Sequence, residues 1–490
     1  MNKSLQYICS AVFGVVVFMY WMLLYPYALG LQEQNQLFLF TWDYFAERIV
    51  IAGGLADYVS EFITQFNYLP YLGEALMAVI FVVFQRSIAK AIGRDDLYAL
   101  SFVAPVMMLI YMGDIYVLLS YLVALIISVQ LCISYCKWKG FVWTAIATVL
   151  GYWLIGPAVF VFTFFVCIKE KNRRSLILIA VAVLTVVISK LTYMHQYPWK
   201  TVVFGVNYYR MAVTVPVMQL IIAGFTLIVP ILADCLPRIK KVTGIIYAIV
   251  LVGGALILHL TYKKDIVEIV AYDQLVRHED WDGILKRAEK YQPDSDLASV
   301  SINLALFMSG RGADFPEFKQ FGTTGLIQPR VRDFISNSSS CEVFWRLGMI
   351  NESLRYAFDT QESLVNNRKS GRWTSRMAEC QILNGRHDVA QKYLDILDHS
   401  LFYRKWAGEH RKYLRNDEEI ASDNVYAYLR SVRYKEDFLF FYPEMDKMLA
   451  KLYYENNNNY LAAWYYKAWT ALKPLNANDE ETFTGNSHAN

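Results

Sequence analysis

The chain has 490 residues, 56% of them hydrophobic and 19% charged, with a formal net charge of +3 at pH 7. This length allows more than one domain, and no concentrated basic patch suggests a nucleic-acid partner. Up to about Leu260 the sequence is a series of apolar runs separated by short charged linkers, whereas from Lys263 onward it resembles a soluble protein. We therefore predict an all-α protein with a polytopic membrane domain at residues 1–262, a soluble helical domain at 263–473 and a disordered polar tail at 474–490.

The apolar runs of the first half have about the length that a bilayer-spanning helix needs, ~17–25 residues. The first run, from Tyr7 to Leu29, is too long for the apolar core of a secretory signal, and no small-residue cleavage site follows it. We expect it to be retained as the first span. The expected spans, about nine in all, are residues 5–29, 70–86, 97–112, 115–135, 141–155, 156–168, 175–193, 213–234 and 242–261.

Short clusters of Lys and Arg separate several of these spans, and such clusters favour the cytoplasmic side of a membrane. They begin at Lys3, Arg86, Lys137, Lys169 and Arg238. With all of them inside, the spans alternate consistently, and the C-terminal domain lies outside. We accordingly predict an integral membrane protein of a bacterial inner membrane with an extracytoplasmic C-terminal domain. The loops expected to face outward are Gly30–Leu69, Met112–Asp114 and Met194–Arg210.

One apolar segment, Phe141–Ile168, must leave the cytoplasm and return to it under this topology. It has about 28 residues, whereas two full spans need ~40. Gly156-Pro157 at its middle favours a turn. We therefore predict two short helices that are buried by their neighbours. The alternative is one long tilted helix, which would invert the orientation of everything that follows, including the C-terminal domain.

The first outward loop contains the stretch TWDYFAERIVIAGGLADYVSEF, Thr41–Phe62. Apolar residues recur at helical spacing on both sides of Gly53-Gly54, which predicts two amphipathic helices that lie on the membrane surface. Thr41 suits the N-cap of the first helix, and Asp43 falls in its first turn, where a carboxylate either complements the helix dipole or takes part in chemistry. We expect the other carboxylates to lie on solvated faces: Glu47, Asp57 and Glu61.

Further polar residues near the outer face are candidates for chemistry. Asp114, in IYMGDIYVL, lies between two apolar runs with almost no loop, and an ionisable group at such a depth is a functional candidate. Glu74 enters the second span near the same face. The third outward loop supplies three basic residues that either neutralise a phosphate or only anchor the chain at the membrane boundary: His195, Lys200 and Arg210.

The soluble half shows repeated helix–turn–helix units. Four segments each place a polar turn before a helical run, and these second helices start near Trp281, Asn351, Arg386 and Tyr460. The starts are separated by about 70, 35 and 74 residues, close to multiples of the 34-residue tetratricopeptide period. We predict a tetratricopeptide-like α-solenoid, which either binds a peptide or protein or only packs on the membrane domain. The apolar segment SDLASVSINLALFMSG is expected to be a buried helix of this domain and not a further span.

The arrangement of the first half resembles the GT-C superfamily of membrane glycosyltransferases. The piece TWDYFAERIVIAGGLADYVSEFITQFNYLPYLGEAL is similar to that family's first outer loop, and MGDIYVLLSYLVALIIS is similar to the element that carries its second acid. The resemblance implies that Asp43 and Asp114 are the catalytic acids, which act as a base or hold a divalent cation such as Mg²⁺ or Mn²⁺. It also implies a membrane-lipid partner, a polyprenyl-phosphate sugar donor and an extracytoplasmic acceptor.

Three hypotheses follow for function. The first is a GT-C-like glycosyltransferase, in which Glu74 and the basic third loop help to bind substrate. The second is a non-catalytic membrane-anchored scaffold or assembly factor that acts through a protein partner on the tetratricopeptide-like surface. The third is a transporter, which we rank last because no span carries a central acid. Cys341 and Cys380 could form a disulfide in an oxidising compartment, which the sequence leaves open.

Overall fold

The computed structural model describes residues 3–170, 172–210, 217–236, 243–312, 321–331, 333–366, 368–434 and 440–476. The chain divides into two compact units, Met1–Tyr262 and Lys263–Asn490. Both units are helical, and the described ranges hold no β-strand beyond one antiparallel bridge between Val117 and Tyr209. The all-α prediction is thereby confirmed. The predicted disorder of the tail concerns residues that, from 477 onward, lie outside the described part of the chain.

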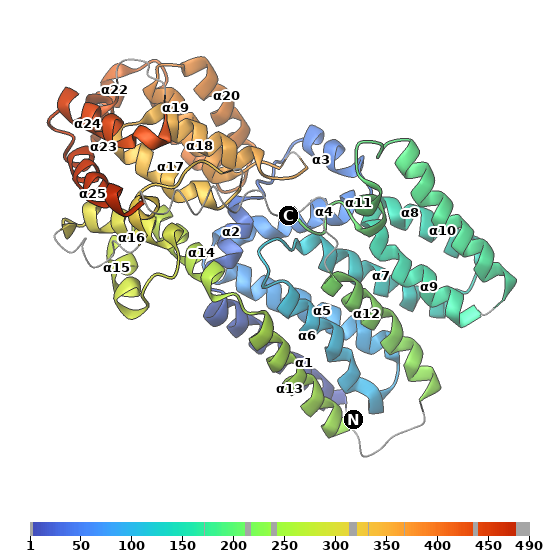
Figure 1. Ribbon diagram of the computed structural model, residues 1–490. Coiled ribbons are helices and arrows are strands. Elements are labelled where there is room, and N and C mark those ends of the chain that lie inside the picture. The colour runs from blue at the N-terminus through green and yellow to red at the C-terminus, as the bar shows by residue number, and fades with distance from the viewer. Residues whose placement is uncertain are drawn as a thin grey trace. The chain divides into compact units, whose positions relative to one another are not determined.

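The first unit is a bundle in which α5 packs against α1, α7 and α12, while α6 packs against α12 and α13 (Figure 1). A second set of neighbours, α7 to α10, completes it. Its helices are α1 (Lys3–Met19), η1 (Tyr20–Leu24), α2 (Ala28–Gln34), α3 (Trp42–Ile49), α4 (Gly54–Thr64), η2 (Gln65–Tyr68), α5 (Leu72–Ile92), η3 (Asp95–Phe102), α6 (Val103–Tyr111), α7 (Leu119–Lys137), α8 (Phe141–Ile155), η4 (Gly156–Ala158), α9 (Val159–Glu170), α10 (Arg173–Leu191), α11 (Trp199–Phe204), α12 (Val217–Cys235) and α13 (Thr243–Thr261).

Six helical segments of the described residues are long and apolar enough to cross a membrane. None of the apolar window Gly244–Thr261 is buried within the protein, and such an all-round apolar surface suits lipid better than water. The chain therefore has the helices that an integral membrane protein requires. The six segments are Lys3–Leu24, Leu72–Ile92, Leu119–Lys137, Phe141–Glu170, Arg173–Leu191 and Gly244–Thr261.

The predicted span at 97–112 corresponds to two consecutive helical elements, and its crossing of a membrane stays a prediction. The region is divided into η3, a 3₁₀ helix, and α6, an α-helix of nine residues. Pro105 lies in the first turn of α6 and has no backbone N–H to donate one turn back, so the α-helical bonding pattern cannot extend through it into η3.

The predicted hairpin within Phe141–Ile168 is confirmed. Gly156 adopts a positive φ of 69° at the turn, which a residue with a side chain would rarely tolerate. The hydroxyls of Thr148 and Thr163 lie 3.1 Å apart, and the rings of Tyr152 and Phe160 stack with centroids 5.7 Å apart. A single straight helix would separate Thr148 from Thr163 by about 22 Å, at ~1.5 Å per residue. The segment α8–η4–α9 therefore turns back on itself, and its 30 residues form two short arms and not one continuous span.

The second unit consists of helices joined by short turns, and neighbours in the chain also pack together. The helix pairs α17–α18, α18–α19 and α19–α20 lie side by side, as do α24 and α25 (Figure 1). Its helices are α14 (Lys264–Arg277), α15 (Trp281–Lys290), α16 (Asp296–Met308), η6 (Gly322–Gly325), α17 (Ser336–Leu347), α18 (Ile350–Glu362), α19 (Gly371–Leu383), α20 (His387–Asp398), α21 (Arg404–His410), η7 (Arg411–Tyr413), α22 (Asp417–Ser422), α23 (Asn424–Val432), η8 (Tyr442–Glu444), α24 (Met445–Glu455) and α25 (Tyr460–Asn476).

The predicted starts of the second helices are confirmed to within one residue at α15, α18, α20 and α25. The segment SDLASVSINLALFMSG is α16, capped by the Ser295 hydroxyl, which accepts a hydrogen bond from the backbone N–H of Ala298 at 3.2 Å. Most of its side chains are buried in the core of the second unit, as predicted. Cys341 and Cys380 are both buried free thiols, and Cys341 contacts the Ser353 carbonyl oxygen at 3.2 Å.

Candidate functional site

Asp114 lies in the tight turn between α6 and α7, where the chain leaves one apolar helix and enters the next. The turn is held by the backbone N–H of Val117, which donates to the Asp114 carbonyl oxygen at 3.0 Å. The half-buried Asp114 carboxylate accepts two hydrogen bonds through different oxygens. The backbone N–H of Tyr116 donates to Oδ1 at 3.0 Å, and the hydroxyl of Tyr209 donates to Oδ2 at 3.2 Å.

The segment that carries Tyr209 pairs with this turn along its backbone. The N–H of Leu118 donates to the Tyr208 carbonyl at 3.1 Å, and the N–H of Arg210 donates to the Tyr116 carbonyl at 2.8 Å. These bonds form the one β-bridge of the described residues, between Val117 and Tyr209. The bridge places the hydroxyl of Tyr209 at Asp114, although 95 residues separate the two in the chain.

Gln32 of α2 joins the two segments from a third direction. Its amide nitrogen donates to the carbonyl oxygens of Ile115 and Val117, each at 3.1 Å. Its amide oxygen accepts a hydrogen bond from the guanidinium of Arg210 at 2.6 Å. Gln36, one turn along the chain, donates to the same oxygen at 3.1 Å. The Asp114 site, defined here as Gln32, Gly113, Asp114, Tyr209 and Arg210, is therefore built from three separate stretches of the chain.

The end of the first span closes the Asp114 site on another side. A Cβ atom added at Gly113 would lie 2.6 Å from the hydroxyl of Tyr25 and 2.8 Å from the hydroxyl of Tyr20, so that only glycine fits without a shift of these rings. Tyr20 begins η1, a five-residue π-helix, and Tyr27 adopts a left-handed φ of 71° just after it. π-Helical turns and left-handed non-glycine residues are uncommon and cluster at functional sites.

The surroundings of Asp114 keep the phenol of Tyr209 protonated, so that a hydrogen-bond donor remains beside the carboxylate. Burial raises the pKa of the Tyr209 phenol, and the negative charge of Asp114 raises it further. Tyr209 therefore retains its proton at neutral pH and continues to donate it to Asp114. An ionised carboxylate can accept about four hydrogen bonds, and two are made to Asp114 by the described residues. The remaining lone pairs can accept a proton from a substrate hydroxyl.

The structure pairs the backbone of Arg210, though not its guanidinium, with the turn that holds Asp114, and among the described residues no other predicted site residue bonds to that turn. Asp43 is exposed in the first turn of α3, and Glu74 is half-buried in the first turn of α5. His195 and Lys200 are exposed in the segment around the start of α11. Among the described residues, no hydrogen bond or ion pair joins any of these four to Asp114.

The expectation that Asp57 and Glu61 are solvated is wrong. Glu61 is fully buried and accepts hydrogen bonds from the hydroxyl of Tyr44 and from Nε of Arg48, the latter at 2.8 Å. Asp57 is 1% exposed and lies 3.9 Å from the same Arg48 nitrogen. These four residues, called the Arg48 cluster below, fill the interface between α3 and α4. A buried guanidinium needs carboxylate partners, and α4 supplies both of them.

The predicted features of the α3–α4 hairpin fit its geometry. The Thr41 side chain accepts a hydrogen bond from the backbone N–H of Tyr44 at 3.2 Å, which makes it the N-cap of α3. Gly53 has a φ of 90° and directly precedes α4. Glu47 is exposed, as predicted.

The described residues contain no group of three or more His, Cys, Asp and Glu side chains that could hold a metal ion. That Asp43 and Asp114 hold a divalent cation stays a prediction. Two carboxylates do not complete the coordination shell of such a cation, so a bound phosphate would have to supply further oxygen ligands. Sequence reasoning missed Gln32, Gly113 and Tyr209. The polar run QEQNQ directly after the first span and the aromatic residues around Arg210 were the available signals.

These features define a class of two-unit helical proteins in which one unit carries helices suited to a membrane. The chain belongs to a family of unknown function, DUF6057, whose model matches residues 2–474. The match runs through both units, so their combination is a property of the family. No curated protein and no solved structure matches the chain.

Proposed function

We propose that the protein is a GT-C-like integral membrane glycosyltransferase that moves a sugar from a polyprenyl-phosphate carrier to an extracytoplasmic acceptor. One observation supports this most directly. A half-buried carboxylate with spare acceptor capacity, Asp114, lies in the turn after an apolar helix, and the guanidinium of Arg210 bonds to Gln32, whose amide also holds the backbone of that turn. A base and a phosphate-binding cation are the two groups that such a transfer needs from the protein.

In the proposed reaction the acceptor hydroxyl oxygen attacks the anomeric carbon of the donor sugar. The hydroxyl proton passes to Asp114, and the bond between the anomeric carbon and the phosphate oxygen breaks. The polyprenyl phosphate leaves with the bonding electron pair, and Arg210 offsets the negative charge that it gains. Gln32 positions Arg210, and Tyr209 positions Asp114.

In this proposal the remaining predicted residues help to bind the substrates. The exposed His195 and Lys200 attract the phosphate as it approaches, and Glu74 contacts the acceptor. Asp43 lies on a surface helix, from which it contributes only if the substrate or a divalent cation bridges it to Asp114. The membrane orientation carries over from the charge pattern, with α3, α11 and the second unit outside a bacterial inner membrane.

The test uses the full chain in detergent with a synthetic short-chain polyprenyl-phosphate hexose, and it measures release of polyprenyl phosphate in the presence of candidate acceptors. Asp114→Asn should reduce transfer at least ~100-fold, the usual contribution of a general base. Glu47→Gln, an exposed acid on α3, should leave transfer unchanged. Asp43→Asn measures whether the two acids act together. Full transfer by both Asp114→Asn and Asp43→Asn would overturn the proposal.

A second candidate function is a membrane-anchored scaffold. The observation that favours it is the packing of successive helix pairs in the second unit, which is the arrangement expected of a tetratricopeptide-like solenoid. Under this alternative, affinity capture with the full chain recovers a partner equally well from natural and Asp114→Asn protein, and neither transfers sugar. Loss of capture with Asp114→Asn would argue against it.

A further inference from the structure

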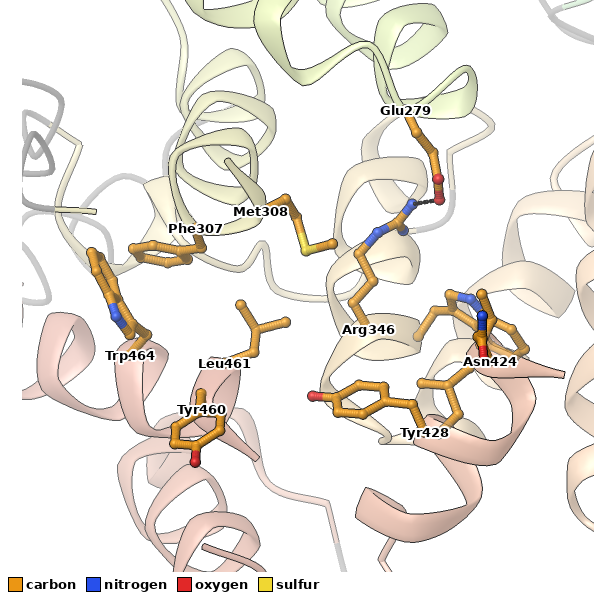
Figure 2. Close-up of a pocket in the computed structure, with 12 residues that line it drawn as sticks. Glu279, Phe307, Met308, Arg346, Asn424, Tyr428, Tyr460, Leu461 and Trp464 are labelled. Atoms are coloured by element: carbon orange, nitrogen blue, oxygen red, sulfur yellow. Dashed lines mark hydrogen bonds and ion pairs between the residues drawn. The ribbon is translucent and has the colours of Figure 1, made fainter. Parts of the chain in front are cut away.

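The second unit contains a partly open cavity of about 480 Å³ (Figure 2). Residues of α16, α17, α23 and α25 line it, together with Glu279 from the turn after α14. The wall around Phe307, Leu461 and Trp464 is apolar, and the rings of Phe307 and Trp464 meet with centroids 4.3 Å apart. Most small-molecule and peptide side-chain sites have this character, a concave apolar surface with a few polar groups.

The rim of the cavity carries large side chains that the second unit leaves in solvent. Tyr460 is 71% exposed, Val425 is 55% exposed and Tyr428 is 40% exposed. In Figure 2, Tyr460 and Tyr428 lie along the same side of the opening, across from Met308. Exposed apolar and aromatic side chains that gather around one concavity mark an interaction site.

Arg346 is the one cation of the cavity lining, and the core fixes its position. It is 8% exposed, its Nη1 donates to the buried carboxylate of Glu342 at 2.7 Å, and its guanidinium lies 5.0 Å from the ring centroid of Trp281. Neither Glu342 nor Trp281 is part of the cavity lining. Arg346 therefore stays in place whether or not a group in the cavity binds its other terminal nitrogen, Nη2.

The other terminal nitrogen of Arg346, Nη2, already has a carboxylate partner. Glu279 accepts a hydrogen bond from Nη2 of Arg346 at 2.8 Å, yet its side chain is 66% exposed. Glu279 also has a left-handed φ of 55°, which is uncommon for a residue other than glycine. Ion pairs with so exposed a partner contribute only ~0–1 kcal/mol. Another carboxylate can therefore displace Glu279 at little cost.

We propose that this cavity binds the acidic segment Asp479–Phe483 of the same chain, DEETF, with Phe483 against the apolar wall and Glu480 or Glu481 on Arg346. The segment offers groups that complement the lining, an aromatic side chain for the apolar wall and carboxylates for Arg346. Lys467 adds a second cation. It is exposed on α25, three residues after Trp464, and therefore lies on the same side of that helix.

The length of chain beyond α25 suits this placement. Residues 477–490 lie outside the described part of the chain, and α25 both lines the cavity near its start and ends at Asn476. From Leu461 to Asn476 the helix rises about 22 Å, at ~1.5 Å per residue. From Asn476 to Phe483 an extended chain spans about 23–25 Å, at ~3.3–3.6 Å per residue. A segment that returns along α25 therefore brings Phe483 level with Leu461. This proposal does not depend on the glycosyltransferase function.

The test is a competition experiment with the full chain in detergent. The probe is a fluorescent peptide of residues 477–490, and the receptor is the chain with Glu480→Gln, Glu481→Gln and Phe483→Ala. This receptor should bind the peptide at least about tenfold more tightly than the natural chain does, because the tethered natural segment competes at a high effective concentration. A matched control with Thr484→Ala, Asn486→Ala and Ser487→Ala should behave like the natural chain. Equal peptide binding by the receptor and the natural chain, or no binding by the receptor, would overturn the proposal.

Substitutions in the cavity locate the site within the same receptor. Tyr460→Ala removes an exposed ring without disturbing the core and should weaken peptide binding about tenfold, as loss of an aromatic anchor does. Glu279→Gln removes the competing carboxylate and should strengthen binding about threefold to tenfold. Tyr454→Ala is the control, because Tyr454 is 69% exposed on α24 and does not line the cavity. Peptide affinity that is the same in the Tyr460→Ala and Tyr454→Ala variants contradicts the proposed site.

Discussion

The Arg48 cluster and the Asp114 site both hold carboxylates in the first unit, but they are built in opposite ways. In the cluster, Glu61 is fully buried, and it receives a guanidinium and a phenol from the adjacent helix. In the Asp114 site the carboxylate is half-buried and receives one backbone N–H and one phenol. Among the described residues no cation bonds to this carboxylate, and the guanidinium of Arg210 bonds to Gln32.

This difference separates a structural role from a chemical one. A buried carboxylate that is paired with a guanidinium stabilises the fold only as part of the pair, and it has little freedom to accept a proton. A partly exposed carboxylate with fixed orientation and free lone pairs can receive one. The comparison thus favours Asp114 over Glu61 as a reacting group.

The largest expected effect comes from breaking the Arg48 cluster. Glu61→Gln leaves the buried guanidinium with less compensation, which should cost roughly 3–5 kcal/mol of unfolding free energy. Thermal unfolding in detergent, followed by helical circular dichroism, measures the change. Glu47→Gln on the same α3 helix is the control and should stay within about 0.5 kcal/mol. A small effect of Glu61→Gln would show that the Arg48 cluster tolerates loss of this charge. Glu61 would then no longer contrast with Asp114 as a carboxylate that the fold requires.

Glu342 in the second unit extends the comparison to a more highly charged cluster. Burial alone would raise the pKa of Glu342, but the guanidiniums of Arg376, Arg346 and Arg372 together hold it well below its usual range. Glu342 contacts these three arginines at 2.9, 2.7 and 3.1 Å. Its charged form therefore stabilises the folded state at neutral pH.

The pH dependence follows from the direction of this shift. A depressed pKa contributes stability that is present above the unfolded value, about 4.3 for Glu, and that is lost as the pH falls through the folded value. Glu342→Gln should cost roughly 3–5 kcal/mol at pH 7. The difference between the natural chain and the variant should shrink as the pH is lowered below about 4. A difference that is constant with pH would show that the charge of Glu342 is not what stabilises the fold.

The sequence was sufficient wherever a feature depends on neighbouring residues. The N-cap at Thr41, the turn at Gly156 and the starts of α15 and α25 each follow from local backbone preferences and helical spacing. The division of 97–112 was also a local effect, since Pro105 lies within it, but the length of the apolar run concealed it.

Distant pairings were out of reach of the same reasoning. Whether Glu61 is solvated depends on a guanidinium thirteen residues earlier that packs from another helix. Gln32 and Arg210 are 178 residues apart, and no periodicity links them. The helical pattern showed which face of α4 is apolar, but it could not show that a neighbouring helix covers two of its acids. Asp114 was identifiable because a short turn between apolar runs is itself a local feature.

The packing behind Asp114 gives a smaller effect. Gly113→Ala would place a Cβ 2.6 Å from the Tyr25 hydroxyl, so the tyrosine rings must move. Overpacking of this kind should cost about 1–3 kcal/mol in unfolding free energy. It should also reduce sugar transfer, because Asp114 is the next residue. Gly224→Ala is the matched control, since a Cβ there meets nothing within 4 Å. Equal stability of the two variants would mean that the rings adapt freely.

The smallest effect isolates the hydrogen bond from Tyr209 to Asp114. Tyr209→Phe keeps the aromatic ring and removes the hydroxyl that donates to Asp114 at 3.2 Å. The loss of this hydrogen bond should lower the unfolding free energy by about 0.5–1.5 kcal/mol. A double-mutant cycle with Asp114→Asn separates this bond from the other contacts of both residues, and its coupling free energy should be about 1 kcal/mol. If the coupling is zero, Tyr209 does not orient the carboxylate, and the Asp114 site loses the feature that distinguishes it from an ordinary acid at a helix end.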